Sequence, residues 1–135
     1  MNSLRALVVD DKEDVLEVNA AVVEFALPGC QVIKCTTLEG ALEVLKNGGP
    51  LALVFTDFQI PDGTEGAQIV EAARKHCPNT PVIVNSGNMS DQVKELCKAD
   101  AHFSKPCEFL LLVNTIKRLA KVHERLTKVQ EAQVA

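Results

Sequence analysis

A short apolar run that ends in a carboxylate constrains the fold of this chain more than any other feature. Residues 51–56 read Leu-Ala-Leu-Val-Phe-Thr, which is long enough for a buried strand but short for a helix. Asp57 follows at once, and the Pro and Gly residues within 58–63 are typical of a loop. A buried strand that delivers an aspartate to its carboxyl end favours an open α/β sheet, because such sheets build their sites at that edge.

Strand-like runs alternate with helical periodicity along the whole chain. We expect strands at 4–9, 31–35, 51–57, 81–85 and 101–104. We expect helices after Asp11, at 38–46, at 66–76, at 90–96 and from about 107 to 130. In the first of them Val15, Val18, Val22 and Phe25 form one apolar stripe, with Leu16 and Val23 beside it. Five β-α repeats predict one doubly wound α/β domain, with parallel strands and helices on both faces of the sheet.

Composition and charge narrow the class of protein. With 135 residues, 47% of them hydrophobic and 24% charged, the chain fits one globular domain. Residues 1–104 carry 8 Lys or Arg against 15 Asp or Glu, and residues 105–135 carry 6 against 3. This acidic body argues against direct nucleic-acid binding, which needs a basic face, and no apolar run has the length of a membrane span. The five cysteines form no C-x-x-C pair, so we expect reduced thiols in a cytoplasmic protein without a signal peptide.

Polar side chains follow several of the expected strands. Asp10 and Asp11 follow the first strand, Asp57 ends the third, and Ser86 and Lys105 follow the fourth and fifth. The carboxyl ends of parallel strands share one edge of the sheet, so these side chains should converge. Carboxylates about 4 Å apart repel by about 4 kcal/mol per pair at an effective dielectric near 20, so a divalent cation or protonation must relieve them. All-oxygen ligands favour Mg²⁺, and the added hydroxyl and lysine suit phosphoryl transfer to Asp57.

These segments together resemble a two-component response-regulator receiver domain of the chemotaxis-regulator type. The resemblance spans about residues 3–120 and is carried by 8–11, 55–57 with 60–61, 82–87 and 103–106. It implies a flavodoxin-like, five-stranded parallel sheet in the order 2-1-3-4-5 with five helices, the last one extended. It also implies a receiver domain at 1–120 and a helical extension at 121–135, which would connect to an output domain or dimerise.

The resemblance also implies roles for individual residues. Asp57 would be the phosphoacceptor, Ser86 would bind the phosphoryl group, and Lys105 would pair with it. The implied Mg²⁺ ligands are Asp10, Asp11, Asp57 and the backbone carbonyl of Gln59. The Lys105-Pro106 bond would be cis, which X-Pro bonds tolerate far better than others do. Gln59 and Asn88 occupy the positions that tune how fast water attacks the acyl phosphate.

Gly66 and His102 are positions at which the sequence departs from the family pattern. Gly66 stands one place later after Asp57 than the family's usual glycine, so we expect a longer loop before it. His102 occupies the aromatic switch position of the output surface, with Phe103 as its inward-facing neighbour. Because an imidazole titrates near neutrality, His102 would make that surface pH-sensitive, or it is an ordinary exposed histidine at a signalling face.

The function implied is a phosphorylation-activated switch of a two-component phosphorelay, with Mg²⁺ as cofactor and slow self-dephosphorylation. The phosphoryl group would come from a sensor histidine kinase or a phosphotransfer protein. Output would pass to a downstream effector protein, a covalently linked output domain or a homodimer, with no direct nucleic-acid or membrane contact. Two alternatives stay open: a degenerate receiver that only binds proteins, and a Mg²⁺-dependent phosphohydrolase with an aspartate nucleophile. Gln59, where a second acid/base aspartate would be needed, argues against the phosphohydrolase.

Overall fold

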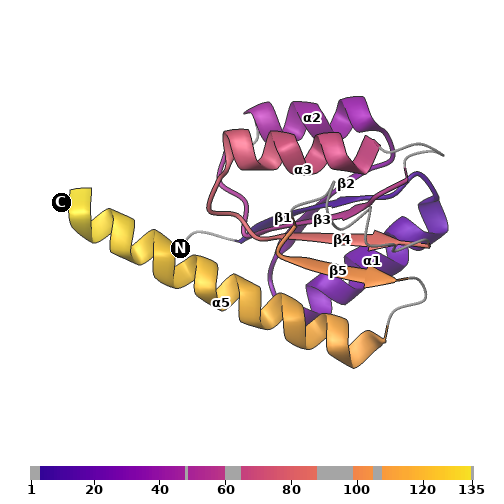
Figure 1. Cartoon of the computed structure of the whole chain (residues 1–135). Helices are drawn as coiled ribbons and strands as arrows, with labels where there is room; N and C mark the ends of the chain where they lie inside the picture. The colour runs from indigo at the N-terminus through magenta and orange to yellow at the C-terminus, as the bar shows by residue number, and fades with distance from the viewer. Residues whose placement is uncertain (1–3, 48, 60–64, 88–98, 105–107, 135) are drawn as a thin grey trace.

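Strands and helices alternate throughout the chain (Figure 1). The computed structural model describes residues 4–47, 49–59, 65–87, 99–104 and 108–134, with the side chains of α5 described as far as Arg125. The elements are β1 (Arg5–Val9), α1 (Glu13–Ala26), β2 (Gln31–Cys35), α2 (Leu38–Asn47), β3 (Leu53–Asp57), α3 (Glu65–His76), β4 (Val82–Ser86), β5 (Ala101–Ser104) and α5 (Phe109–Val134). The helix predicted at 90–96 lies outside the described residues.

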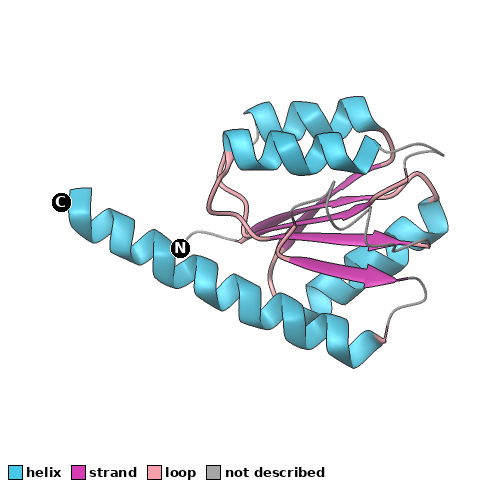
Figure 2. Ribbon diagram, viewed as in Figure 1, coloured by secondary structure: helices cyan, strands magenta, loops and turns pink. Residues whose placement is uncertain are grey.

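The five strands form one parallel sheet in the order β2-β1-β3-β4-β5, which confirms the predicted fold class. Helices α2 and α3 cover one face of the sheet, and α1 and α5 cover the other (Figure 2). The central strands β3 and β4 are buried along their whole length, whereas the edge strand β2 is partly exposed. Burial on both faces explains why residues 51–56 are continuously apolar instead of alternating with polar residues.

Successive residues of each strand supply two separate cores. Val54 faces α2 and α3 and packs in a cluster with Ile69, whereas Phe55 faces α1 and α5 and packs with Val23 and Ile116. All five of these side chains have at most 1% of their surface exposed. The two cores together hold the carboxyl ends of β1, β3 and β4 in register at one edge of the sheet.

The predicted inward stripe of α1 is wrong in part. Val22 is buried, and so are Leu16 and Val23, which the sequence places beside the stripe, but Val18 and Phe25 are 62% and 60% exposed. Apolar residues occupy most of the circumference of α1, so its periodicity alone does not choose the inward face. Packing against α5 decides it, because Leu16 and Val23 share one core with the inner side chains of α5.

The last helix begins at Phe109, two residues later than predicted, and continues to Val134. Its second half extends well beyond the edge of the sheet (Figure 1). The predicted extension at 121–135 is therefore continuous with α5 through Val134. Among the described helices, none has the length and apolar character needed to cross a membrane.

Candidate functional site

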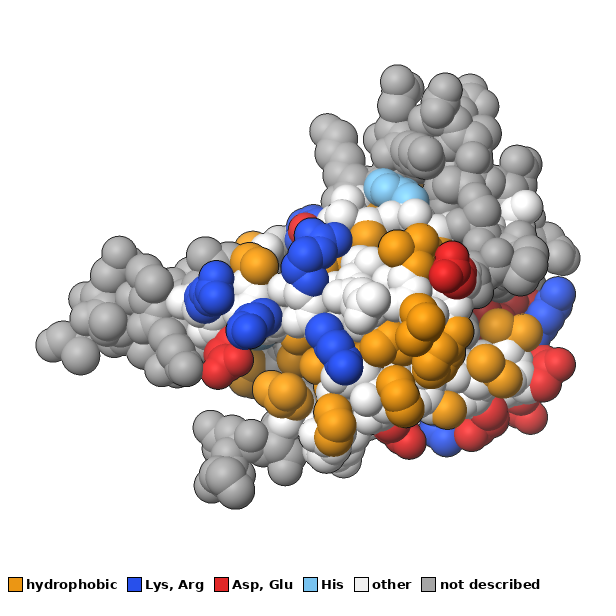
Figure 3. Space-filling view, turned by 90° about the horizontal axis from the view of Figure 1, so that it is seen from below, with side chains coloured by type: hydrophobic (Ala, Val, Ile, Leu, Met, Phe, Trp, Pro, Cys, Tyr) orange, Lys and Arg blue, Asp and Glu red, His pale blue; other side chains and the backbone are white. Residues whose placement is uncertain are grey.

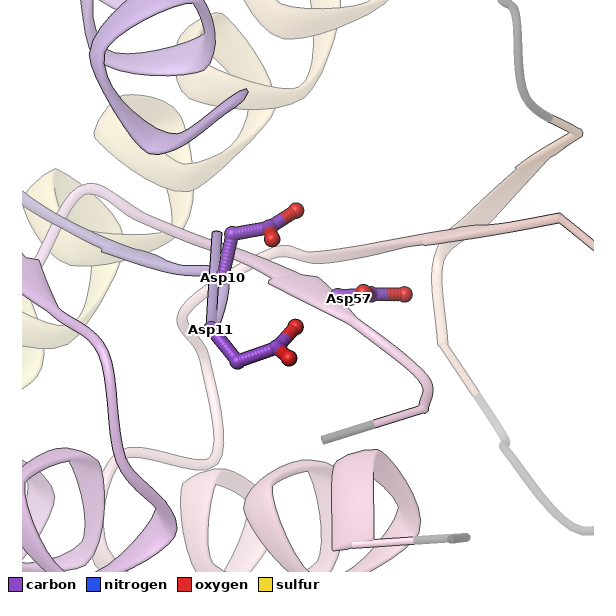
Figure 4. Close-up of side chains that lie close together, drawn as sticks. All are labelled: Asp10, Asp11 and Asp57. Atoms are coloured by element: carbon purple, nitrogen blue, oxygen red, sulfur yellow. The ribbon is translucent and has the colours of Figure 1, made fainter. Parts of the chain in front are cut away.

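Three carboxylates meet at the carboxyl edge of the sheet. Asp10 and Asp11 follow β1, and Asp57 is the last residue of β3. Strands β1 and β3 are neighbours, with Val9 paired to Thr56, so the residues that follow them lie side by side. One carboxylate oxygen from each aspartate lies within 4.8 Å of the other two. The three carboxylates point into the same space beyond the strand ends (Figure 4).

The burial of these carboxylates makes their mutual repulsion matter. Asp10 is fully buried, Asp57 keeps 7% of its surface exposed, and Asp11 is half-buried. At the separations observed, two unit charges repel by about 3–4 kcal/mol at an effective dielectric of about 20. Three hard oxygen donors at one edge of the sheet fit a small divalent cation such as Mg²⁺ better than a softer metal. The residues present therefore fit the predicted cofactor.

Backbone N–H groups hold two of the carboxylates in place. The Lys12 N–H donates to Asp10 Oδ1 at 3.0 Å, and the Gln59 N–H donates to Asp57 Oδ1 at 3.3 Å. The Thr56 hydroxyl donates to the Asp57 carbonyl oxygen at 2.9 Å. Gln59 therefore lies next to the cluster, and it is half-buried.

The backbone after Asp57 is clamped between α3 and β4. The Phe58 N–H donates to the Asn85 carbonyl oxygen at 3.0 Å, and the Gly66 N–H donates to the Phe58 carbonyl oxygen at 2.8 Å. A Cβ atom added at Gly66 would lie 2.4 Å from Phe58 Cα and 2.5 Å from the Asp57 carbonyl oxygen. Only a residue without a side chain allows the start of α3 to approach Asp57 this closely.

Strand β4 brings Ser86 and Asn85 to the same edge. Ser86 is fully buried at the end of β4, and Asn85 is the register partner of Asp57. Sequence reasoning missed Asn85, whose side chain is 5% exposed and whose Oδ1 has no hydrogen-bond partner within the described part of the chain. The sequence signal for it is a single amide at the end of an otherwise apolar strand, 82–84.

Strand β5 carries the two residues assigned to the output surface. Phe103 is 9% exposed and packs into the core beneath α1 and α5, so it faces inward as expected. His102 is half-buried and pairs in register with Val84. Lys105, Pro106 and Asn88 lie outside the described residues, and so does the predicted cis bond.

Comparison with known proteins now decides the family. The protein-family model described as response regulator receiver domain matches residues 6–117, which is most of the chain. The chain belongs to this family. A CheY-like response regulator receiver domain protein from Methanospirillum hungatei JF-1 shares 28% identity and a TM-score of 0.79, covering 92% of this chain and 98% of that one. The family, and with it a role in two-component signalling, is confirmed.

More distant structures share the fold of this receiver domain. The structure described as adenylate cyclase from Rhodopirellula baltica has 23% identity and a TM-score of 0.81, with 98% of both chains covered. The N-terminal domain of a response regulator/sensory box/GGDEF 3-domain protein from Carboxydothermus hydrogenoformans has 18% identity and a TM-score of 0.75, covering 91% of this chain and 98% of that one. At these identities the similarity shows the fold alone.

A hollow lies at the edge of the sheet opposite the aspartate cluster. A cavity of about 380 Å³ opens beside the ends of α2 and α3 and the middle of α5, and its lining includes Lys46, His76 and His123. His123 Nδ1 lies 3.0 Å from the Asn79 carbonyl oxygen, which ties α5 to the turn before β4. The cavity shares no residue with the aspartate cluster, and the chemistry expected of a receiver domain belongs to the cluster.

The described cysteines of this receiver domain are free thiols. Burial raises the pKa of the Cys30 thiol, with Glu24 adding to the shift, and burial also raises the pKa of Cys35. Burial raises the pKa of Cys77 as well, although a hydrogen bond with Thr80 and the charge of Arg74 oppose it. A raised pKa leaves little thiolate at neutral pH, which suits small buried side chains and not reactive nucleophiles.

Proposed function

We propose that this receiver domain is a phosphorylation-activated switch of a two-component phosphorelay, with Asp57 as the phosphoacceptor. The observation that carries the proposal is the meeting of three carboxylate oxygens, within 4.8 Å of one another, at the carboxyl edge of the sheet. Asp57 ends the central strand β3, and its side chain is buried with 7% of its surface exposed. A cytoplasmic histidine kinase or phosphotransfer protein would supply the phosphoryl group.

The proposed metal ligands are Asp10, Asp11, Asp57 and the backbone carbonyl of Gln59. Bound there, Mg²⁺ would offset the carboxylate charge and the charge on the phosphoryl oxygens. The Asp57 carboxylate oxygen attacks phosphorus, an acyl phosphate bond forms, and the phosphorus–nitrogen bond of the donor histidine breaks with its electron pair left on the imidazole. The Ser86 hydroxyl donates to a phosphoryl oxygen, and the Lys105 ammonium pairs with another.

The reverse step uses water. A water molecule attacks the phosphorus atom of the acyl phosphate, inorganic phosphate leaves, and the Asp57 carboxylate is restored. Gln59 and Asn88 are the side chains that we assign to controlling access of this water. In this proposal self-dephosphorylation is slow. It serves as the timer of the switch and not as an enzyme activity toward other substrates.

The switch itself is a shift between two populated conformations. Phosphorylation adds negative charge beside Ser86, and Ser86 is paired in register with Ser104 at the end of β5. A movement of Ser86 therefore reaches the strand that carries His102 and Phe103. We assign these two residues to the output surface, where His102 would change its exposure.

Output then passes to another protein or a linked domain. Two structural neighbours bear the names of larger signalling proteins, an adenylate cyclase and a response regulator/sensory box/GGDEF 3-domain protein. The unbroken course of α5 through Val134 supports a connector or dimerisation role for residues 121–135, beyond a receiver domain at 1–120. We propose that this chain contacts neither nucleic acid nor a membrane directly.

Intact-mass spectrometry tests this function. The full chain is incubated with acetyl phosphate and Mg²⁺, beside Asp57→Asn and beside Asp14→Asn, an exposed aspartate of α1 that serves as a matched control. We expect one labile phosphoryl group on the wild type and on Asp14→Asn, and none on Asp57→Asn or with a chelator present. No adduct and no donor consumption would leave a protein-binding module, and rapid turnover of a small phosphate ester would indicate a phosphohydrolase.

A further inference from the structure

Helices α1 and α5 expose an apolar patch on the side of the molecule away from α2 and α3. We call it the α1–α5 patch, and its side chains are Val18 (62% exposed), Phe25 (60%), Phe109 (46%), Leu110 (62%) and Leu111 (54%). The rings of Phe25 and Phe109 contact each other with their centroids 5.4 Å apart, which joins the two helices' contributions. Hydrophobic side chains gather over this face in Figure 3. Several large apolar side chains grouped in this way indicate an interaction surface.

Charges of opposite sign flank the patch. Helix α1 carries no Lys or Arg, and its four acidic residues are Glu13, Asp14, Glu17 and Glu24. Between residues 117 and 125, α5 carries four basic residues, Lys117, Arg118, Lys121 and Arg125, and one acid, Glu124. Figure 3 shows the Lys and Arg side chains along α5 on the left and most of the Asp and Glu side chains at the lower right edge.

Within the part of the chain that the structure describes, ion pairing of the acids of α1 is limited. Among its acids, only Glu17 forms an ion pair within the described residues, with Lys34 of β2 at 2.8 Å. That pair is exposed, with 42% and 65% of the two side chains accessible, so it contributes little to stability. The bases of α5 form no ion pair within the described residues, so both groups of charges remain available to an outside partner.

The charges lie at matching distances on opposite sides of the Phe25–Phe109 contact. Glu17 and Asp14 precede Phe25 by 8 and 11 residues, and Arg118 and Lys121 follow Phe109 by 9 and 12. At 1.5 Å per residue both pairs lie about 12–18 Å from the contact. Each of the two helices starts at the carboxyl edge of the sheet and runs toward the other edge, so the acidic and basic groups extend in opposite directions from the contact.

We propose that the α1–α5 patch binds a second copy of this chain in a two-fold dimer. Rotation by 180° about an axis through the Phe25–Phe109 contact places the apolar patch of one copy against the apolar patch of the other. The same rotation sets the acidic α1 of each copy against the basic α5 of the other, twice over. An interface with an apolar centre and a charged rim has the usual anatomy of a specific contact. The proposal does not depend on phosphorylation of Asp57.

Sedimentation equilibrium of the full chain tests the dimer with two reversed-charge variants. Variant A is Asp14→Lys with Glu17→Lys, and variant B is Arg118→Glu with Lys121→Glu. In each variant the two copies of the dimer present like charges to each other, so self-association should weaken on the order of tenfold or more. Mixing A with B restores opposite charges at both rims, so the mixture should form a heterodimer of about wild-type affinity.

The controls separate this interface from general effects of charge and folding. Glu39→Lys with Glu43→Lys reverses two exposed acids on α2, across the sheet, and should leave the wild-type dimer unchanged. Phe25→Ser should abolish the dimer, and circular dichroism should show each variant folded because all the substituted side chains are exposed. Raising the salt concentration should weaken the wild-type dimer.

Three results would overturn the proposal. The wild type could stay at the 14.6 kDa of the monomer at millimolar concentration. It could dimerise with an affinity that Phe25→Ser does not change. Variants A and B could fail to associate when mixed although each is folded. If the wild type is monomeric and A and B lose phosphorylation by a histidine phosphotransfer protein, the patch serves that other partner and the dimer is refuted.

Discussion

The contact between Gly66 and the backbone of Asp57 and Phe58 allows a quantitative prediction for Gly66→Ala. The new Cβ atom would lie 2.4 Å from Phe58 Cα, 2.5 Å from the Asp57 carbonyl oxygen and 2.6 Å from the Phe58 carbonyl oxygen. All three are backbone atoms, so no side chain can rotate away to make room. Because carbon atoms make contact at about 3.5 Å, α3 and the loop must separate by about 1 Å.

Several energies combine in this substitution. Overpacking of this kind costs about 1–3 kcal/mol, and the hydrogen bond from the Gly66 N–H to Phe58 is strained or lost, which costs about 0.5–1.5 kcal/mol. Alanine regains up to about 1 kcal/mol through its higher helix propensity. We therefore expect Gly66→Ala to lower the free energy of unfolding by about 1–3 kcal/mol. We also expect phosphorylation by acetyl phosphate to slow by about tenfold to a hundredfold, because a displacement of about 1 Å moves the Asp57 carboxylate.

Urea unfolding followed by circular dichroism measures the stability, since the chain has no Trp or Tyr for fluorescence. Gly40→Ala is the matched control, because its Cβ atom would meet the Thr37 side-chain oxygen at 3.1 Å and no backbone atom within 4 Å among its three nearest neighbours. A rotation of Thr37 relieves that contact but loses the hydrogen bond from the Gly40 N–H to Thr37 Oγ1 at 3.1 Å, which costs about 1 kcal/mol. The higher helix propensity of alanine offsets this cost by up to about 1 kcal/mol, so Gly40→Ala should be about neutral in stability and in rate. Equal stabilities and equal phosphorylation rates for the two variants would refute the reasoning.

Three further predictions follow from the charges and hydrogen bonds. Asp11→Asn removes one of three mutually repelling carboxylates, so it should raise stability in chelator by about 1–2 kcal/mol and abolish stabilisation by Mg²⁺. Melting curves that respond to Mg²⁺ as the wild type does would contradict this. Asp100→Ala should lower the free energy of unfolding in urea by about 1–3 kcal/mol, because Asp100 Oδ2 accepts from the Val82 N–H at 2.7 Å and from Arg74 at 3.0 Å. Glu17→Ala breaks an exposed ion pair and should lower it much less. Equal losses for the two variants would count against the argument. Burial raises the pKa of the thiols of Cys30, Cys35 and Cys77. Peptide mapping at mildly alkaline pH should therefore find that these thiols are alkylated more slowly than a free cysteine, and their alkylation rates should keep rising as the pH increases.

The sequence predicted the sheet well because its strands are buried on both faces. A run such as 51–56 has few alternatives to a central parallel strand, and the observed β3 begins at Leu53 and ends at Asp57. The meeting of Asp10, Asp11 and Asp57 follows from the same topology, since parallel strands end at one edge. These features depend on local pattern and on chain order, both of which are visible in the sequence.

Other features depend on contacts between distant segments, which a local pattern does not contain. The inward face of α1 is chosen by α5, which leaves Val18 and Phe25 exposed against the prediction. The contact of His123 with Asn79 joins residues 44 positions apart. Asn85 Oδ1 is buried without a hydrogen-bond partner among the described residues, and this is visible only once β4 lies beside β3.

Chemical mapping of the phosphorylated residue tests the central claim most directly. The chain is phosphorylated with acetyl phosphate and Mg²⁺, the acyl phosphate is reduced with borohydride, and the peptides are sequenced by mass spectrometry. Reduction converts a phosphorylated aspartate to homoserine. We predict homoserine at position 57 alone, and none when the chelator replaces Mg²⁺. Homoserine at position 10 or 11, or none at all under conditions that phosphorylate a control receiver domain, would contradict the assignment of Asp57.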